Sequence, residues 1–167
     1  MTDMPVGVTL LGATGSIGRS TIRVIARHPD RFRIVALTAA RSTESLDELA
    51  RDLDPDFVVL AHDRPTDFEP RWAGEWKYGA DQLAAAAAGT EGGIVVNALV
   101  GYAGLESTLC ALQSGRRLAL ANKESLVAGG ELVLEAWRSG GGEILPVDSE
   151  HSAIHQCLVG RPTEEVS

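Results

Sequence analysis

The sequence predicts an α/β fold with a doubly wound, mainly parallel sheet and helices on both of its faces. The first observation is a short apolar run over residues 6–11, which ends in a glycine-rich turn and passes at once into a helical pattern. The second is that β-branched runs alternate with helical patterns along the chain, as in parallel sheets. The third is that polar clusters follow several of these runs, and ligands of parallel sheets collect beyond the carboxyl ends of the strands.

The glycine-rich turn reads Gly12-Ala13-Thr14-Gly15-Ser16-Ile17-Gly18. Glycine has no Cβ, so it permits positive φ and a close approach of the backbone to a bulky anion. The helix expected to begin near Ser16 adds free N–H groups and the positive end of its dipole, which suit a pyrophosphate. The spacing G-x-x-G-x-x-G departs from the commoner G-x-G-x-x-G, and a glycine turn without a ligand is the alternative.

The elements after the turn repeat the order strand, helix, strand. The first helix ends at Pro29, and its apolar face is predicted to comprise Ile17, Thr21, Val24, Ile25 and His28. Strands are predicted over residues 33–38 and 57–61. The helix between them, with N-cap candidates at Ser42 and Thr43, is indicated by the helical spacing of Leu46, Leu49 and Leu53. This order builds right-handed, parallel crossovers, so the predicted fold is Rossmann-like.

The second half of the chain continues the alternation. Residues 62–73 contain prolines and charges and are expected to form a loop. Further strands are predicted over residues 75–78, 93–98, 117–121 and 144–147. Helices are predicted over residues 81–88 and 105–112, and around Val133, Leu134, Ala136 and Trp137. No internal repeat and no linker between two complete domains is evident in the sequence.

Composition and charge argue against several classes of protein. The net charge is −8 and the isoelectric point about 4.9, which disfavours nucleic acid and anionic membranes as partners because both attract basic surfaces. No apolar run reaches the roughly 18 residues of a membrane span, and the N-terminus lacks the basic start of a secretory signal. Cys110 and Cys157 are too few and too distant for a disulfide framework or a zinc site, so a reducing, cytoplasmic location is expected.

Four strand ends carry polar clusters, and a parallel sheet would bring them to one edge. They are Thr14 with Ser16, Arg41 with Ser42, Asn122 with Lys123 and Glu124, and Asp148 with Ser149 and Glu150. At the end of the second strand, an acid would accept hydrogen bonds from the ribose 2′-OH of NAD. The chain instead has Arg41 and Ser42 there and no acid before Glu44, which favours the 2′-phosphate of NADP(H). An exposed arginine in a turn is the alternative.

The clusters after the last two strands have residue types that suit a metal and an anionic substrate. Asp148 and Glu150 offer oxygen ligands for Mg²⁺ or Mn²⁺, although the Asp148 side chain is equally suited to cap the following helix. His151 and His155 form the rival zinc-like pair, which lacks a cysteine or an adjacent glutamate in the usual pattern. Lys123, one of two lysines in the chain, could bind an anionic oxygen or polarise a carbonyl, unless its segment is simply a turn.

Three segments are long and specific, and they occur in a fixed order. They are the glycine turn at 12–18, Leu-Ala-Asn-Lys-Glu-Ser-Leu-Val at 120–127 and Leu-Pro-Val-Asp-Ser-Glu-His-Ser-Ala-Ile at 145–154. From about Val8 to about Leu158, the sequence resembles the 1-deoxy-D-xylulose 5-phosphate reductoisomerase family. The resemblance implies NADPH-dependent conversion of this phosphorylated sugar to 2-C-methyl-D-erythritol 4-phosphate in non-mevalonate isoprenoid synthesis. It also implies a divalent metal, Mg²⁺ or Mn²⁺ with Co²⁺ as a further candidate, and a homodimer.

The resemblance further implies roles for individual residues. Those expected at NADPH are Thr14, Gly15, Ser16, Ile17, Ala40, Arg41, Ser42, Asn122 and Glu124, and the family often has glycine in place of Ala40. Those expected at the substrate are Lys123, Ser149 and Glu150, of which Lys123 and Glu150 are expected to be catalytic. Those expected at the metal are Asp148 and Glu150.

Family members are more than twice as long as this chain. Residues 1–148 are therefore interpreted as the NADPH-binding domain, and residues 149–167 as the start of a truncated catalytic and metal-binding domain. The chain is expected to bind NADPH without turning over, because further substrate and metal ligands would lie beyond it. One alternative is another NADP-dependent dehydrogenase of the semialdehyde type, which would need a reactive cysteine, and another is a non-catalytic nucleotide-binding module.

Overall fold

The computed structural model describes residues 4–89 and 93–160. Every predicted strand forms, with each end within one residue of the expected position. The strands are β1 Val6–Leu11, β2 Phe32–Ala39, β3 Phe57–Leu60, β4 Glu75–Tyr78, β5 Ile94–Asn97, β6 Arg117–Leu120 and β7 Glu143–Pro146. The helices are α1 Ser16–Arg27, α2 Thr43–Leu53, α3 Ala80–Ala88, α4 Ala103–Gln113, α5 Lys123–Gly140 and α6 Ser149–Leu158.

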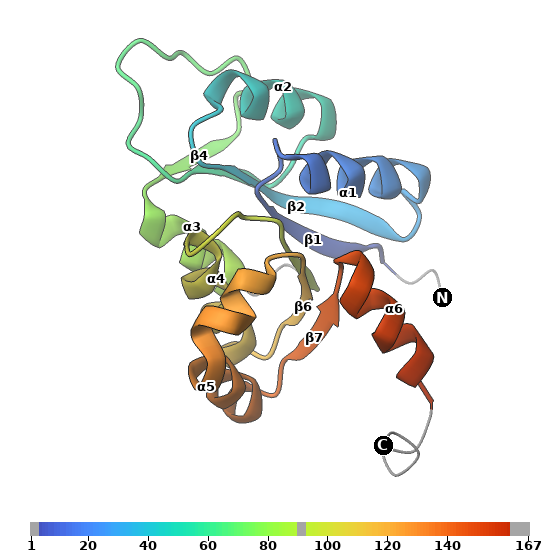
Figure 1. The fold of residues 1–167 in the computed structure, drawn as a ribbon. Helices are drawn as coiled ribbons and strands as arrows, with labels where there is room; N and C mark the ends of the chain where they lie inside the picture. Colours follow the sequence, from blue (N-terminus) through green and yellow to red (C-terminus); the bar gives the residue numbers. More distant parts are fainter. Residues whose placement is uncertain (1–3, 90–92, 161–167) are drawn as a thin grey trace.

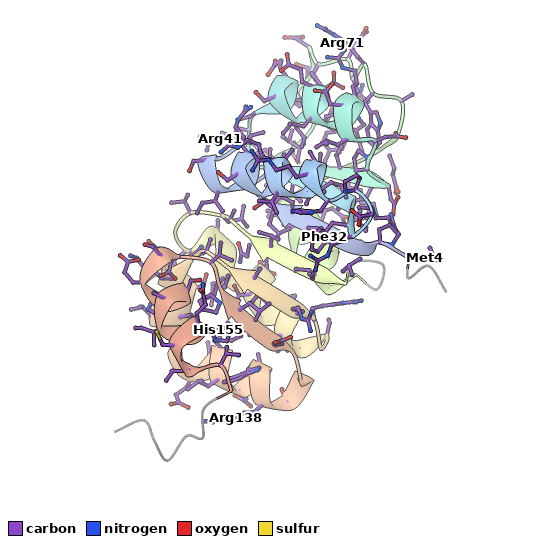
Figure 2. All side chains as sticks on the ribbon, turned by 90° about the vertical axis from the view of Figure 1, so that its right-hand side faces the viewer. Met4, Phe32, Arg41, Arg71, Arg138 and His155 are labelled. Atoms are coloured by element: carbon purple, nitrogen blue, oxygen red, sulfur yellow. The ribbon has the colours of Figure 1, made fainter. Side chains whose placement is uncertain are left out.

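The strands form one sheet in the order β4-β3-β2-β1-β5-β6-β7, and each neighbouring pair is parallel (Figure 1). The order runs outward in both directions from β1, as in a doubly wound sheet. The Rossmann-like α/β prediction is therefore confirmed. All strands end at the same edge, and Figure 2 labels Phe32 and Arg41 at the beginning and just beyond the end of β2.

Helices cover both faces of the sheet, and β1 shows why. Val8 and Leu10 point into one apolar cluster, which includes Leu46 of α2, whereas Leu11 points into the other cluster with Ala111 of α4 and Val133 of α5. Successive side chains of a strand alternate between the two faces. Both faces of β1 are therefore covered, one by α1 and α2 and the other by α3, α4 and α5 (Figure 1).

The predicted apolar face of α1 is partly wrong. The helix buries Gly18 and Ile25, and Ile22 packs against the same cluster. Ile17 and Val24 are exposed instead. The reason is the close approach of Gly18 to the glycine turn, where an added Cβ would overlap the backbone carbonyls. That contact sets the rotation of the helix about its axis.

Two helices have features that matter for the site. α5 is kinked at Gly130, whose φ of 40° and ψ of −116° are not helical and suit a residue without a Cβ. α6 packs against β7 and buries none of its residues. None of the helices in the described part of the chain is long and apolar enough to cross a membrane.

Candidate functional site: the carboxyl edge of the sheet

The glycine turn is held to the end of β2 by Thr38. Gly12 has a φ of +81°, and its N–H donates to the Thr38 hydroxyl over 3.1 Å. The next N–H, from Ala13, donates to the Thr38 carbonyl over 2.8 Å. A Cβ on Gly12 would lie 2.9 Å from the Ala98 carbonyl oxygen, which is too close for any other residue to fit without a shift. The turn is thus fixed between β2 and the segment after β5.

The N-terminus of α1 is built to accept an anion. The N-cap residue is Gly15, no side chain caps the helix, and its first turn contains no acid. Gly15, Ser16 and Ile17 are exposed, and Thr14 is half-buried. The free N–H groups and the positive end of the helix dipole therefore face solvent at the carboxyl edge. This arrangement suits the diphosphate of a dinucleotide, because no acid in the first turn opposes its charge.

The segment after β2 presents a cation at the same edge. Ala40, Arg41 and Ser42 are all exposed. The Ser42 carbonyl accepts the first helical hydrogen bond of α2, from Leu46 over 2.9 Å, but its hydroxyl caps nothing. Arg41 donates from Nε to Nε2 of His62 over 3.2 Å. Both the guanidinium and the Ser42 hydroxyl therefore remain accessible to a ligand such as a 2′-phosphate.

The segment after β6 divides into a buried and an exposed part. Asn122 is 2% exposed, its side-chain oxygen accepts from the Ser125 N–H over 3.0 Å, and its nitrogen donates to the Gly101 carbonyl over 2.7 Å. Asn122 is thus the N-cap of α5, and its amide is already engaged. Lys123 and Glu124 are exposed and line a cavity of about 530 Å³ together with Tyr102, Val127 and Ala128.

The segment after β7 holds the two predicted metal ligands. Asp148 caps α6, because its carboxylate accepts from the His151 N–H over 2.9 Å and lies 2.7 Å from the His151 ring nitrogen. The Ser149 hydroxyl donates to Glu150 over 3.0 Å. The backbone and ring contacts of His151 lower the pKa of Asp148, and the charge of Lys123 lowers it further.

The pKa of Glu150 is also lowered, first by its own backbone N–H, then by the Ser149 hydroxyl and the charge of Lys123. The charge of Lys123 thus lowers the pKa of both carboxyl groups, and the segments that hold the three residues follow the paired strands β6 and β7. The two carboxylates suit a hard divalent cation, but Asp148 is engaged by His151. No group of three or more histidines, cysteines or acids of metal-binding proximity occurs within residues 4–89 and 93–160. Among the described residues, Asp148 and Glu150 are therefore joined by no third ligand of these types.

The four predicted clusters lie along one edge in the order set by the sheet. From β2, which precedes Arg41, to β7, which precedes Asp148, there are four strand spacings, or about 19 Å. The glycine turn lies after β1, between these ends. An extended dinucleotide with a small substrate beyond it matches this linear arrangement better than a compact ligand would.

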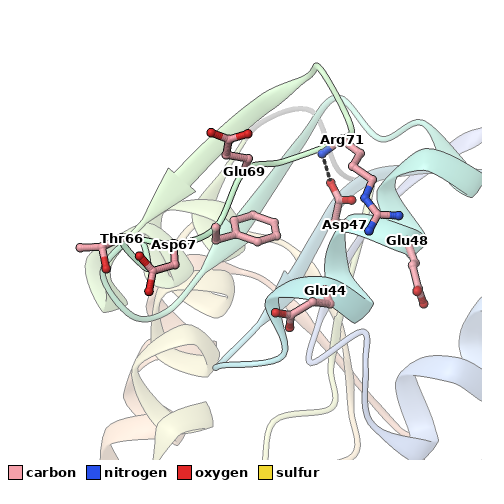
Figure 3. Close-up of a pocket in the computed structure, with 8 residues that line it drawn as sticks. Glu44, Asp47, Glu48, Thr66, Asp67, Glu69 and Arg71 are labelled. Atoms are coloured by element: carbon pink, nitrogen blue, oxygen red, sulfur yellow. Dashed lines mark hydrogen bonds between the residues drawn. The ribbon is translucent and has the colours of Figure 1, made fainter.

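A further cavity, of about 570 Å³, lies between α2 and the loop that precedes β4 (Figure 3). Its lining includes Glu44, Glu48, Asp67 and Glu69, all of them acids. Asp47 is buried there and accepts from the backbone N–H groups of Arg71 and Trp72 over 3.0 and 2.9 Å. The acidic lining opposes an anionic cofactor, and Asp47 has a clear structural role in anchoring the loop.

Several residues at the edge were not singled out from the sequence. Strand pairing brings Thr38 to Gly12 and His62 to Arg41. Tyr102 lines two cavities at the same edge. Asn97 is fully buried and donates to the Gly104 carbonyl and the Thr108 hydroxyl over 2.9 and 3.0 Å. A polar residue at the last position of an otherwise apolar strand was the available signal for Asn97.

Cys110 is poorly suited to be a nucleophile. It lies inside α4, and burial together with the negative charge of Glu106 raises the pKa of its thiol. A raised pKa leaves less of the reactive thiolate at neutral pH. This environment disfavours the semialdehyde-dehydrogenase alternative, which would need an activated cysteine.

Comparison with known proteins gives a consistent result. The sequence profile of 1-deoxy-D-xylulose 5-phosphate reductoisomerase matches residues 8–130. The chain is 47% identical over 170 residues to the reductoisomerase of Rhodococcus jostii, covering 98% of this chain and 40% of that protein. The solved reductoisomerase of Zymomonas mobilis in complex with NADPH superposes with a TM-score of 0.84 at 42% identity, over 96% of this chain and 42% of that one.

A crystal structure of DOX-P reductoisomerase in complex with magnesium superposes with a TM-score of 0.86 at 39% identity, again over 96% of this chain and 40% of that one. The chain thus spans about 40% of the length of the relatives that it matches.

Proposed function

The chain belongs to the 1-deoxy-D-xylulose 5-phosphate reductoisomerase family, and we propose that it is the NADPH-binding portion of such an enzyme. The whole enzyme would convert 1-deoxy-D-xylulose 5-phosphate to 2-C-methyl-D-erythritol 4-phosphate with NADPH and a divalent metal. The proposal rests on two neighbouring features of the carboxyl edge, the uncapped N-terminus of α1 after β1 and the exposed Arg41 after β2. The hydrogen bond between Gly12 and Thr38 joins the two strand ends. Together they offer one site to a diphosphate and another to a 2′-phosphate.

Each group at the edge has a distinct task in this proposal. The backbone of Thr14 to Ile17 binds the diphosphate, and Arg41 and Ser42 bind the 2′-phosphate. Asn122 is a positioning residue, because its side-chain amide is hydrogen-bonded to the Gly101 carbonyl and the Ser125 N–H. Glu124, exposed on the first turn of α5, faces the cofactor. NADPH supplies the hydride for the reducing step.

The substrate would lie at the far end of the edge. The Lys123 ammonium and the Ser149 hydroxyl bind its oxygens, and Glu150 binds both the substrate and the metal with Asp148 as the second carboxylate. A divalent cation held there acts as a Lewis acid on neighbouring substrate oxygens. Two carboxylates leave most of the coordination sphere to water and to other ligands. The isolated chain is therefore proposed to bind NADPH without catalysing turnover.

The domain boundary is proposed at residue 148. Residues 1–148 would form the cofactor domain, and residues 149–167 would begin the catalytic, metal-binding one. The support is that α6 buries none of its residues against the described sheet domain. We further propose a homodimer for the full-length enzyme, by analogy with the family. The unpaired Cys110 and Cys157 support a cytoplasmic location.

Calorimetric titration of the 167-residue chain with NADPH and, separately, with NADH tests this function. A clear preference for NADPH is expected, with no NADPH oxidation when 1-deoxy-D-xylulose 5-phosphate and Mg²⁺ are added. Equal affinity for NADH would contradict the role of Arg41. Binding of neither cofactor would contradict the cofactor site, and robust oxidation by this chain would show that it contains a complete active site.

A further inference from the structure

The contact between Arg41 and His62 has a consequence for cofactor choice. We propose that His62 is a positioning residue, which orients the Arg41 guanidinium and thereby strengthens the preference for NADPH over NADH. The inference rests on the proposed cofactor. Its basis is the hydrogen bond from Arg41 Nε to His62 Nε2, at 3.2 Å, between two side chains that are otherwise exposed at the carboxyl edge.

The pairing of β2 with β3 makes these two residues neighbours. Ala39 is the register partner of Leu60, and the Ala61 N–H continues the ladder with a 2.9 Å bond to the Ala39 carbonyl. Arg41 and His62 each lie two residues beyond the Ala39–Leu60 pair. The register of β2 and β3 thus brings the segments that follow the two strands side by side, and Arg41 and His62 are equivalent positions in those segments.

The hydrogen bond determines which part of Arg41 is left for a ligand. Arginine has only N–H donors, so His62 accepts through Nε2 and carries its ring proton on Nδ1. With Nε engaged, the two terminal nitrogens form the fork that remains, and such a fork matches the oxygens of a phosphate. Within the described residues Arg41 forms no ion pair. Its charge is therefore available to the 2′-phosphate.

His62 contacts a cavity at the carboxyl edge as well as Arg41. His62 and Ala40 line a cavity of about 290 Å³, together with Leu99 and Tyr102 from the segment after β5. His62 therefore contacts both this cavity and the guanidinium. A side chain held in place before binding loses less conformational entropy when the ligand arrives. His62 thus lowers the cost of ordering Arg41, and this gain is realised only with a ligand that contacts Arg41.

Four variants of the 167-residue chain test the proposal by calorimetric titration with NADPH and NADH. His62→Ala and His62→Phe both remove the acceptor, and phenylalanine keeps the ring. We expect each to weaken NADPH binding about fivefold while NADH binding changes less than about twofold. His62→Gln places an oxygen acceptor near the same point and is expected to retain the wild-type ratio of affinities. His28→Ala, at another exposed histidine beyond the end of α1, is the matched control and is expected to change neither.

The variants and the wild-type chain together separate failure of the positioning role of His62 from failure of the proposed NADPH site. If His62→Ala and His62→Phe keep the wild-type ratio, or if His62→Gln loses it as fully as they do, the positioning role is wrong while the proposed NADPH site stands. A parallel loss of NADH affinity would likewise overturn it, since the 2′-phosphate would not be involved. Failure of the wild-type chain to bind either cofactor contradicts the proposed function itself, and with it this inference.

Discussion

Asn122 lies so close to Gly104 that a Cβ on Gly104 would overlap the side-chain nitrogen of Asn122. The same nitrogen donates to the Gly101 carbonyl, and Asn97 on the neighbouring strand donates to the carbonyl of Gly104. Two asparagines at the ends of β5 and β6 therefore hold the start of α4 through its backbone. That contact links the carboxyl edge of the sheet to the packing of α4.

Gly104→Ala is expected to displace Asn122 from this position. Overpacking at a buried contact costs about 1–3 kcal/mol, so the free energy of unfolding measured in urea should fall by that amount, and NADPH should bind more weakly. Gly89→Ala is the matched control, because its Cβ would meet only ordinary contacts, the nearest at 3.4 Å. Unchanged stability and affinity in Gly104→Ala would show that the contact is not restrictive.

Thr38→Val is expected to loosen the glycine turn without changing the volume of the core. The variant removes the hydroxyl that accepts from the Gly12 N–H, and an unpaired buried donor costs about 1 kcal/mol or more. Thermal denaturation should show the loss of stability, and titration should show weaker NADPH binding. Thr21→Val, whose hydroxyl bonds within α1 to the Ile17 carbonyl, should leave NADPH affinity unchanged. Equal effects of the two variants would argue against a tether.

Substitutions at the substrate end separate charge from helix capping. The experiment uses a full-length relative, in which the aspartate equivalent to Asp148 is replaced by asparagine. Asparagine keeps an oxygen that can accept from the His151 N–H, but it lacks the negative charge. We expect this change, like Lys123→Ala, to lower kcat/KM by roughly 100-fold or more while the protein stays folded. Gln156→Ala, on the exposed α6, serves as the control. Retained activity in both site variants would make the assignment of Lys123 and Asp148 wrong.

The two cysteines should differ in reactivity. The pKa of Cys110 is raised by burial and by Glu106, so its thiolate forms only at higher pH than that of an unperturbed thiol. Cys157 is exposed on α6. Alkylation with iodoacetamide at pH 7.5, a condition chosen near neutrality, should modify Cys157 about tenfold faster than Cys110, as followed by peptide mass spectrometry. Faster modification of Cys110 would revive the case for a catalytic cysteine.

The strands and helices along the chain could be predicted because apolar runs and turn residues carry that information locally. The rotation of α1 could not, because it depends on the contact of Gly18 with the carbonyls of the glycine turn, which no helical periodicity contains. The burial of Asn122 was equally hidden. Its sequence neighbours Lys123 and Glu124 are exposed, and only the packing of α4 shows that the asparagine points inward.

The partners of the site residues depend on strand register. Thr38 reaches Gly12, and His62 reaches Arg41, because β2 lies between β1 and β3 in this register. A sequence pattern gives the strands in chain order, but it specifies neither which strands are neighbours in the sheet nor which residues face each other. For the predicted metal ligand Asp148, by contrast, the local sequence did contain the contact that the structure shows. The capping of α6 by Asp148 was one of two readings of the same residues, and the structure contains the cap.

The two carboxylates near the start of α6 are held less firmly than the other groups at the carboxyl edge. The glycine turn and Asn122 are fixed by buried contacts, whereas Asp148 and Glu150 belong to a helix that buries none of its residues. Their separation from Lys123 is therefore set by the position of that helix on β7. A cation bound between the carboxylates would restrict α6. Because the coupling of two binding events is reciprocal, a second ligand that holds α6 in the same position would raise the affinity for the cation by the factor by which the cation raises the affinity for that ligand.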